Sequence, residues 1–322
     1  MWLGFALFPE SASTISGRVD LLYFFLLAVS LFFAVLISSL VIYFAVKYRR
    51  RSETERPMPI HGDIRLELVW TLIPLGLTMI MFVWGTNLFF AYAKAPSEAL
   101  EIFVVGKQWM WKLQHPEGKR EINELHVPVG YPVKLTMTSE DVIHSFFIPA
   151  FRNKMDVLPG RYTSLWFEAT KTGEYQLFCA EYCGTRHSGM IGKIIVMDPW
   201  EYEKWLGTSI ATEAEESLEE SGEKLFNQLG CQTCHKMDAT ARGPSLTGLF
   251  GKTIQLQNGR SVTADEGYIR ESIINPSAKI LAGYEPIMPT YTGQINEEQL
   301  IQILAYIKSL GSVKKNTDHG TP

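Results

Sequence analysis

The stretch CAEYCGTRHSGM, from Cys179 to Met190, places two cysteines, a glutamate, a histidine and a methionine within twelve residues. The chain has four cysteines in all, so half of them lie here. The flanking runs EYQLF and GKIIVM read as β-strands, because they are rich in β-branched and aromatic residues and are bounded by turn residues. The stretch therefore predicts a loop of potential metal ligands between two strands.

The side chains of this loop favour copper. Thiolate and thioether sulfur are soft ligands that select copper, and imidazole suits it as well. Three alternatives stay open: an extracellular cysteine pair often forms a disulfide, two cysteines with two histidines can hold structural zinc, and the loop can be an ordinary hairpin. A disulfide leaves His187 and Met190 unexplained, and zinc leaves Met190 unexplained.

One more imidazole ligand is expected from outside the loop. His144, in the run DVIHSFF, lies 35 residues before Cys179 at the end of another strand-like run. His115 and His126 are less suitable, because they lie in polar, turn-like stretches. The sequence therefore predicts that His144 joins the loop residues at the metal.

The other two cysteines belong to CQTCH, which has the C-x-x-C-H pattern of haem c attachment. Cys231 and Cys234 would add to the haem vinyl groups, and His235 would bind the iron. Met288, in YEPIMPTY, is the expected ligand on the opposite face, and a methionine there raises the potential and suits electron transfer. Met237 is a rival, but it is too close to His235 to reach that face; a purely packing role for Met288 also stays open.

Two apolar runs near the start predict a membrane hairpin. Leu21–Val46 and Leu68–Ala93 each contain 26 residues without a charge, and a bilayer core needs about 20. Buried core helices are the alternative, but such helices rarely run so long without a charged face. The segment KYRRRSETER between the runs is rich in Lys and Arg, which predicts a cytoplasmic loop. Both termini would then lie on the outer face of a prokaryotic cell membrane.

The residues after the hairpin divide into two regions. From Glu101 to Met197 the runs EIFVV, PVKLTMT, TSLWFEA, EYQLF and GKIIVM predict a small antiparallel β-sandwich or barrel. PWEYEKWL, from Pro199, predicts a short helix, and an acidic run of glutamates follows. The pattern then becomes helical, and Asn296 and Gln299 have the spacing of a capping box at the start of the last helix.

These features predict six segments along the chain. They are an outer N-terminal segment (1–20), a transmembrane hairpin (21–93), a copper domain (94–206), an acidic linker (207–221), a haem domain (222–311) and a tail (312–322).

Taken together, the motifs resemble subunit II of a haem–copper cytochrome c oxidase fused to a cytochrome c domain, the caa-type arrangement. The resemblance covers nearly everything from about residue 20 to residue 310. It implies a multidomain chain, with a two-helix transmembrane hairpin, an all-β cupredoxin-like sandwich and an all-α cytochrome c domain. It also implies a dinuclear copper centre with the ligands His144, Cys179, Glu181, Cys183, His187 and Met190.

Within that centre the resemblance gives each residue a role. Cys179 and Cys183 bridge two copper ions, and His144 and His187 each bind one of them. Met190 and the backbone carbonyl of Glu181 are weak axial ligands. The Glu181 side chain is also similar to the family's ligand for a magnesium ion shared with subunit I.

Two further residues carry expected roles. GKQWMWKLQ is similar to the family's aromatic stretch near the copper, in which Trp109 occupies the position where electrons enter; Met110 stands where the family usually has an aromatic residue. RLELVWTLIP resembles the start of the family's second membrane helix, in which Glu67 matches the acid at the mouth of a proton pathway. Trp109 as a core aromatic and Glu67 as a boundary charge are the alternatives.

The resemblance implies that the chain brings electrons into a terminal oxidase. Electrons would pass from an external donor (cytochrome c or a respiratory complex) through covalent haem c and the copper pair to a haem of the catalytic subunit, which reduces oxygen to water with proton pumping. The implied partners are subunit I, further membrane subunits and lipid, with no nucleic acid. Two rivals stay open: the related nitric oxide reductases, and a membrane-tethered cytochrome that uses the sandwich only as a spacer.

Overall fold

The computed structural model describes residues 8–56, 62–210, 216–236 and 241–311. The predicted tail, Met237, the first part of the N-terminal segment and the middle of the predicted linker lie outside the described residues. The chain forms two compact units: residues 14–94, and residues 1–13 together with 95–322.

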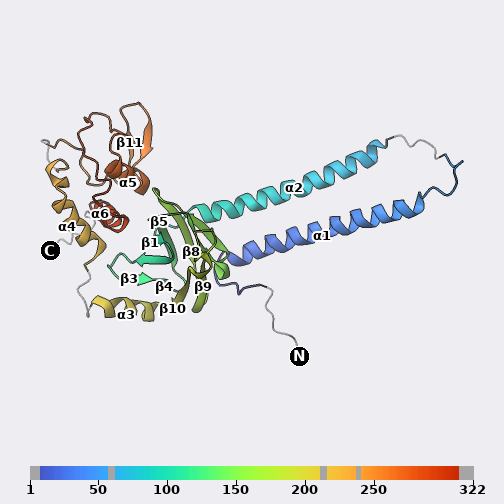
Figure 1. Cartoon of the computed structure of the whole chain (residues 1–322), viewed down its shortest axis with the longest axis horizontal. Coiled ribbons are helices and arrows are strands. Elements are labelled where there is room, and N and C mark those ends of the chain that lie inside the picture. The colour runs from blue at the N-terminus through green and yellow to red at the C-terminus, as the bar shows by residue number, and fades with distance from the viewer. Residues whose placement is uncertain (1–7, 57–61, 211–215, 237–240, 312–322) are drawn as a thin grey trace, which may run out of the picture. The chain divides into compact units, whose positions relative to one another are not determined.

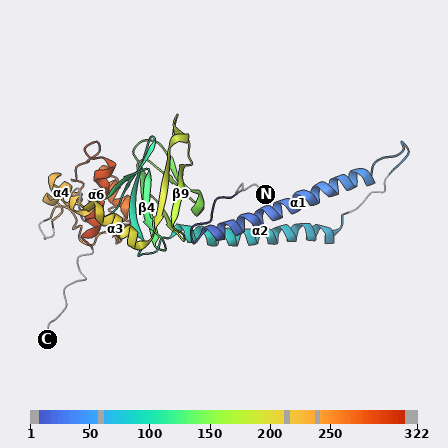
Figure 2. The same cartoon turned by 90° about the horizontal axis from the view of Figure 1, so that it is seen from below.

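The first unit is the predicted hairpin. Helices α1 (Ser16–Lys47) and α2 (Ile64–Ala93) contain the two apolar runs and lie alongside each other (Figures 1 and 2). Most of their large apolar side chains are exposed, and each helix exceeds the roughly 20 residues needed to cross a bilayer. The Asp63 side chain caps α2 by accepting a hydrogen bond from the backbone N–H of Arg65 at 2.9 Å. The two helices therefore have the length and surface of membrane spans.

The second unit contains a β-sandwich of two five-stranded sheets. One sheet has the strand order β3-β2-β1-β5-β8 and the other the order β4-β10-β9-β6-β7. The strands are β1 (Leu100–Lys107), β2 (Met110–Gln114), β3 (Arg120–Ile122), β4 (Glu124–Pro128), β5 (Pro132–Ser139), β6 (His144–Ile148), β7 (Asn153–Val157), β8 (Thr163–Glu168), β9 (Gly173–Cys179) and β10 (Ile191–Met197).

The five predicted strands are confirmed as β1, β5, β8, β9 and β10. The prediction of an antiparallel sandwich was wrong for two pairs: β1–β5 and β4–β10 are parallel, which is possible because their strands are not consecutive in the chain, and the other pairs are antiparallel. Alternate residues of the strands face inward, so that Trp111, Phe146 and Phe167 are almost completely buried between the sheets. These side chains form the core that holds the two sheets together.

The segment that precedes α1 belongs to this sandwich. Ala12 is fully buried in its core; its N–H donates to the carbonyl of Ala150 at 3.0 Å, and its carbonyl accepts from the N–H of Thr170 at 2.9 Å. Ser13 forms a β-bridge with Ala169. The segment before the hairpin and the chain after it therefore belong to the same folded unit.

The remaining elements are mainly helical. They are α3 (Pro199–Ile210), α4 (Leu218–Gln228), a hairpin of β11 (Thr253–Gln255) and β12 (Ser261–Thr263), α5 (Glu266–Ile274) and α6 (Glu297–Ser309). The predicted capping box of the last helix is confirmed, because Asn296 and Gln299 each accept a hydrogen bond from the other's backbone N–H. A second capping box, Ser217 with Glu220, starts α4 at the end of the acidic run.

Candidate functional site

The predicted copper loop connects the ends of two paired strands. β9 ends at Cys179, and β10 begins at Ile191. β6 lies on the other side of β9, with Phe146 opposite Cys179, and this pairing brings His144 to the loop. The expectation that His144 ends a strand was wrong: it is the first residue of β6, because the short run before it is a turn and not a strand.

The two sulfurs of the loop lie close enough to share metal ions. Cys179 and Cys183 are free thiols, with 3.7 Å between their Sγ atoms. The Nδ1 atom of His144 is 4.0 Å from the sulfur of Cys179, and the Nδ1 atom of His187 is 3.5 Å from the sulfur of Cys183. Metal–thiolate bonds are about 2.3 Å long, so one ion can reach both sulfurs at the same time. A second ion can do so from the other side of the line that joins the sulfurs.

Two weaker donors complete the cluster, one beside each sulfur. The backbone carbonyl oxygen of Glu181 is 3.2 Å from the Cys179 sulfur, and the Met190 sulfur is 3.8 Å from the Cys183 sulfur. The cluster thus offers six donors, whereas a tetrahedral zinc site uses four. A set dominated by sulfur and imidazole fits a pair of copper ions better than one zinc ion.

The surroundings of His144 orient its ring. The imidazole is fully buried, and its Nε2 atom lies 2.8 Å from Oδ1 of Asp141, so Nδ1 faces the Cys179 sulfur. Burial lowers the pKa of His144, but hydrogen bonds with Cys179 and Asp141 outweigh burial and raise it. A Cβ atom at Gly106 would lie 3.0 Å from the His144 ring, so any other residue at this position would press on the ring.

Ionisation of the sulfur pair begins at Cys179. Burial opposes loss of its proton, but hydrogen bonds from His144 and from the backbone outweigh burial and lower the pKa of Cys179. Burial and the neighbouring Cys179 raise the pKa of Cys183. Binding of a metal ion requires that both thiols lose their protons, and the ion itself promotes that loss.

Trp109 is half-buried against the same loop. Its indole Nε1 donates to the carbonyl oxygen of Cys183 at 3.2 Å, and the Gln108 side chain donates to the same oxygen at 2.8 Å. Gly184 has a φ of +113°, and a Cβ there would lie 2.9 Å from the Gln108 amide nitrogen. The aromatic residue that the sequence singled out therefore contacts a metal-ligand residue directly.

The two histidines that seemed to lie in turns are part of a buried cluster. His115 is fully buried, with Nε2 at 2.8 Å from Glu121 and Nδ1 at 3.2 Å from the Tyr202 hydroxyl. His126 belongs to β4. Its ring stacks on Trp205, with 4.3 Å between the ring centroids, and pairs with Glu121. The description of His126 as a turn residue was wrong, because it lies in β4 opposite Ile195 of β10. His115 does begin a turn between β2 and β3, in which its carbonyl accepts from the N–H of Gly118 at 3.0 Å.

Glu67 and the side chain of Glu181 lie apart from these contacts. Glu67 is an exposed residue in the first turn of α2, at the end that follows the basic segment. The Glu181 side chain is exposed, although its backbone carbonyl points at the sulfur cluster.

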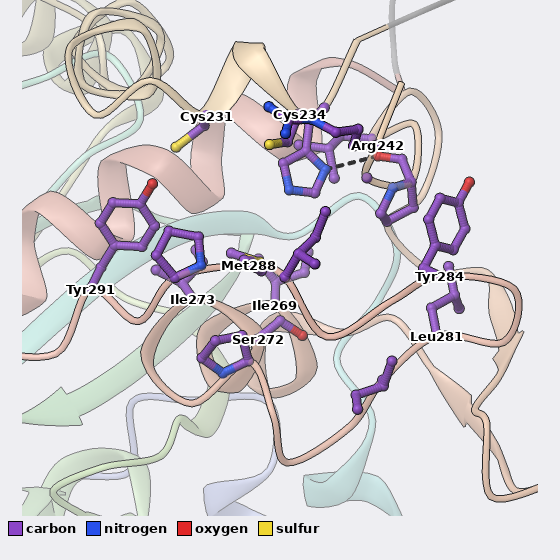
Figure 3. Close-up of a pocket in the computed structure, with 18 of the residues that line it drawn as sticks. Cys231, Cys234, Arg242, Ile269, Ser272, Ile273, Leu281, Tyr284, Met288 and Tyr291 are labelled. Atoms are coloured by element: carbon purple, nitrogen blue, oxygen red, sulfur yellow. Dashed lines mark hydrogen bonds between the residues drawn. The ribbon is translucent and has the colours of Figure 1, made fainter. Parts of the chain in front are cut away.

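The second site is an apolar cavity in the C-terminal region, with a volume of about 380 Å³. Figure 3 shows Cys231 and Cys234 on one side of it and Met288 across from them. Ile269 and Ile273 of α5 and residues of α6 also line it. All the lining residues come from the described part of residues 226–307, and most of their exposed surface is apolar.

The residues around His235 fit a haem ligand. Nδ1 of His235 donates to the carbonyl oxygen of Pro244 at 2.9 Å, which leaves Nε2 free for iron (dashed line in Figure 3). A Cβ at Gly243 would lie 2.9 Å from the His235 ring, so glycine keeps this position open. The Tyr291 hydroxyl donates to the carbonyl of Leu229, which ties the loop after Met288 to the turn before Cys231.

Comparison with known families gives the same layout in three parts. The model for the transmembrane domain of cytochrome c oxidase subunit II matches residues 1–86, the model for the periplasmic domain of the same subunit matches residues 119–198, and the model for cytochrome c matches residues 219–311.

Individual proteins are also similar. Cytochrome c oxidase subunit 2 of Alkalihalophilus pseudofirmus is 33% identical over 280 residues, which cover 82% of this chain and 79% of that protein. The subunit 2 of Thermostichus vulcanus is 27% identical, over 76% of this chain and 92% of its own length. The crystal structure of the periplasmic domain of subunit II from Bradyrhizobium japonicum is 36% identical, covers 36% of this chain and 96% of its own, and has a TM-score of 0.35.

Proposed function

The chain belongs to the cytochrome c oxidase subunit II family, and from this premise we propose that it binds two copper ions and one covalently attached haem c. It is the subunit through which electrons enter a haem–copper oxidase, and it works in association with the catalytic subunit. We assign the copper ions to His144, Cys179, Glu181, Cys183, His187 and Met190, and the haem to Cys231, Cys234, His235 and Met288.

One observation carries the copper assignment. Two free thiols lie 3.7 Å apart, and each has one imidazole and one weaker donor beside it. A sandwich that served only as a spacer would need no such cluster of buried sulfur and nitrogen atoms. When bound, the copper pair and the haem are the groups that carry electrons, one at a time.

The residues around the ligands hold the site rigid. The Cys179–Met190 loop is anchored at both ends by strands, and the N–H of Cys179 donates to the carbonyl of Met190 at 3.2 Å. Asp141 fixes the His144 ring, while Gln108 and Trp109 fix the carbonyl of Cys183. Ligands that move little between two charge states keep the reorganisation of the site small, which favours fast electron transfer.

The orientation in the membrane follows from charge and from chain connection. The segment between α1 and α2 is rich in Lys and Arg, which supports a cytoplasmic position for it. The buried position of Ala12 joins the segment before α1 to the sandwich after α2, so both must lie on one side of the membrane. We therefore assign both redox domains to the outer face.

Three finer assignments complete the proposal. The exposed carboxylate of Glu181 is available for a magnesium ion at the boundary with the catalytic subunit, since this ion prefers oxygen ligands. Glu67, in the first turn of α2, would take up protons at the cytoplasmic end. The external donor would be cytochrome c or a respiratory complex that reduces the haem.

The proposal is tested by counting metals and haem in the purified complex. We expect two copper ions per chain, and a haem that stays with the polypeptide on a denaturing gel. Zinc without copper would contradict the copper assignment, and haem without copper would favour the spacer alternative. Turnover with nitric oxide in place of oxygen would identify the reductase alternative.

A further inference from the structure

The haem domain contacts the copper domain through a mixed apolar and charged surface. Phe103 and Val105 of β1 are each only 3% exposed, and they belong to the same buried cluster as Ile301 and Leu304 of α6. The sandwich therefore contributes two side chains to the core of the domain that follows it. We name the surface around these residues the β1 interface.

Four charged side chains form a closed ring at this interface. Lys308 lies 2.6 Å from Glu101 and 2.9 Å from Glu266, and Lys134 lies 2.9 Å from Glu101 and 3.3 Å from Glu266. Glu101 and Lys134 come from the sandwich, while Glu266 and Lys308 come from α5 and α6. Each side chain is between 17% and 27% exposed, so the charges are only partly screened by water.

Two further contacts lie outside the ring. Arg270 of α5 pairs with Glu297 and donates to the carbonyl of Gly160 in the sandwich at 2.6 Å. Lys112 of β2 pairs with Glu298 in the first turn of α6 at 2.8 Å. Three separate polar contacts around an apolar centre allow only one orientation of the two domains.

The interface leaves the haem cavity open. Ile269, Ile273 and Ile303 line the cavity, whereas Glu266 and Lys308 of the same two helices bond to the sandwich. None of the described cavity-lining residues belongs to the sandwich. An external donor can therefore reach the haem domain while that domain stays on the β1 interface.

We infer that the haem domain is held at the β1 interface in one fixed position, and that Lys308 is the residue that positions it. This rests on the proposed function, because it describes how the haem is presented to the copper pair. The alternative is a domain that swings on its linker and docks only at intervals.

A modest interface is enough to hold a tethered domain. A short linker supplies an effective concentration on the order of 1 mM, so an interface with a dissociation constant of about 10 µM between separate domains keeps the docked fraction at about 99%. The charged ring fits this role, since its four ion pairs share their partners and lie at the edge of an apolar contact.

Hydroxyl-radical footprinting of the full chain tests the position directly. We expect Phe103 to be protected like the fully buried Phe146, and not oxidised like Phe178, which is 36% exposed. Lys308→Glu should raise the oxidation of Phe103 by about tenfold, because a tenfold weaker interface raises the undocked fraction by that factor. Lys308→Arg should restore protection.

Two controls separate docking from folding. Lys224→Glu makes the same charge change on an exposed residue of α4, and it should leave Phe103 protected. Glu101→Lys breaks the ring from the sandwich side, so it exposes Phe103 without a change inside the haem domain. In each variant, a reduced haem that does not bind carbon monoxide shows that the domain is folded, because Met288 then still reaches the iron. Oxidation of Phe103 at the rate of Phe178 in the unaltered chain would overturn the inference, even if both copper and haem are present.

Lengthening the linker gives a second readout. Addition of about twenty Gly and Ser residues between α3 and α4 lowers the effective concentration of a swinging domain severalfold. We expect less than a twofold change in the rate of electron transfer between the two domains of the unaltered chain and of Lys224→Glu, because a docked fraction of about 99% falls only to about 96% when the effective concentration falls about fourfold. In Lys308→Glu the docked fraction should fall from about 91% to about 71%, so that the oxidation of Phe103 rises about threefold. A rate in the unaltered chain that falls with linker length would mean that the domain swings.

Discussion

The indole nitrogen of Trp109 lies 3.2 Å from the carbonyl oxygen of Cys183, a residue that also carries one of the two loop sulfurs. An aromatic ring at the surface of the sandwich is thus bonded to the polypeptide of the metal loop. This contact supports the proposal that electrons reach the copper site through Trp109.

Replacement of Trp109 by Phe should slow electron transfer to copper by tenfold or more, because Phe retains an aromatic ring but lacks the indole N–H that bonds to Cys183. Copper content should not change, since the six donors remain. Stopped-flow reduction of the copper pair provides the measurement. Trp200→Phe is the matched control, because Trp200 is 76% exposed on α3; equal rates for both variants would remove the role of Trp109.

Replacement of Cys183 by Ser should abolish the copper pair, since a single sulfur at Cys179 cannot bridge two ions. Metal analysis should show loss of both copper ions, while haem content stays the same because the haem site lies in another domain. Full copper content in this variant would show that the Cys183 thiolate is not a bridging ligand. Met155→Ala, at a partly exposed residue of β7, serves as a control for the stability of the sandwich.

Replacement of Met288 by Ala should leave the haem attached, because attachment depends on Cys231 and Cys234. The reduction potential should fall, and the iron should bind carbon monoxide, since the thioether no longer fills the sixth position. Redox titration and the spectrum of the reduced protein with carbon monoxide provide the measurements. An unchanged spectrum would show that another residue is the ligand.

Replacement of Glu67 by Gln should lower steady-state oxygen consumption without changing the rate at which the donor reduces the haem. The reason is that Glu67 lies in the membrane hairpin, whereas the ligands belong to the other folded unit. Asp63→Asn is a nearby control that keeps a capping side chain at the start of α2. Normal turnover of Glu67→Gln across the pH range would exclude a role in proton uptake.

The β1 interface should weaken in acid. Burial raises the pKa of Glu101, but Lys308 and Lys134 outweigh burial and lower it from 4.5 to about 2. The part of this lowering that comes from Lys308 is present only in the docked state, so the ionised carboxylate stabilises docking, and that stabilisation is lost as Glu101 is protonated between about pH 4.5 and 2. Footprinting of Phe103 should therefore show increasing exposure over this range. Glu101→Gln removes this titration, so it should show a weaker interface and a smaller response to acid; an unchanged response would assign the effect to other carboxylates such as Glu266.

The sequence by itself determined the parts that depend on short spacing. The C-x-x-C-H run, the ligand loop between two strands, the two uncharged apolar runs and the capping box of α6 are all local patterns, and local geometry is enough to fix them. The comparisons support the same order of domains, because each domain carries its own motif.

The tertiary structure alone decided which distant residues meet. Asp141 on the His144 ring, Trp109 on the carbonyl of Cys183 and the burial of His115 depend on which strands pair, and short strands such as β2, β3 and β6 carry too little pattern to be predicted. The contact between Glu101 and Lys308 spans 207 residues of sequence. Opposite charges are common on any surface, so only the packing of α6 on β1 selects these two as partners.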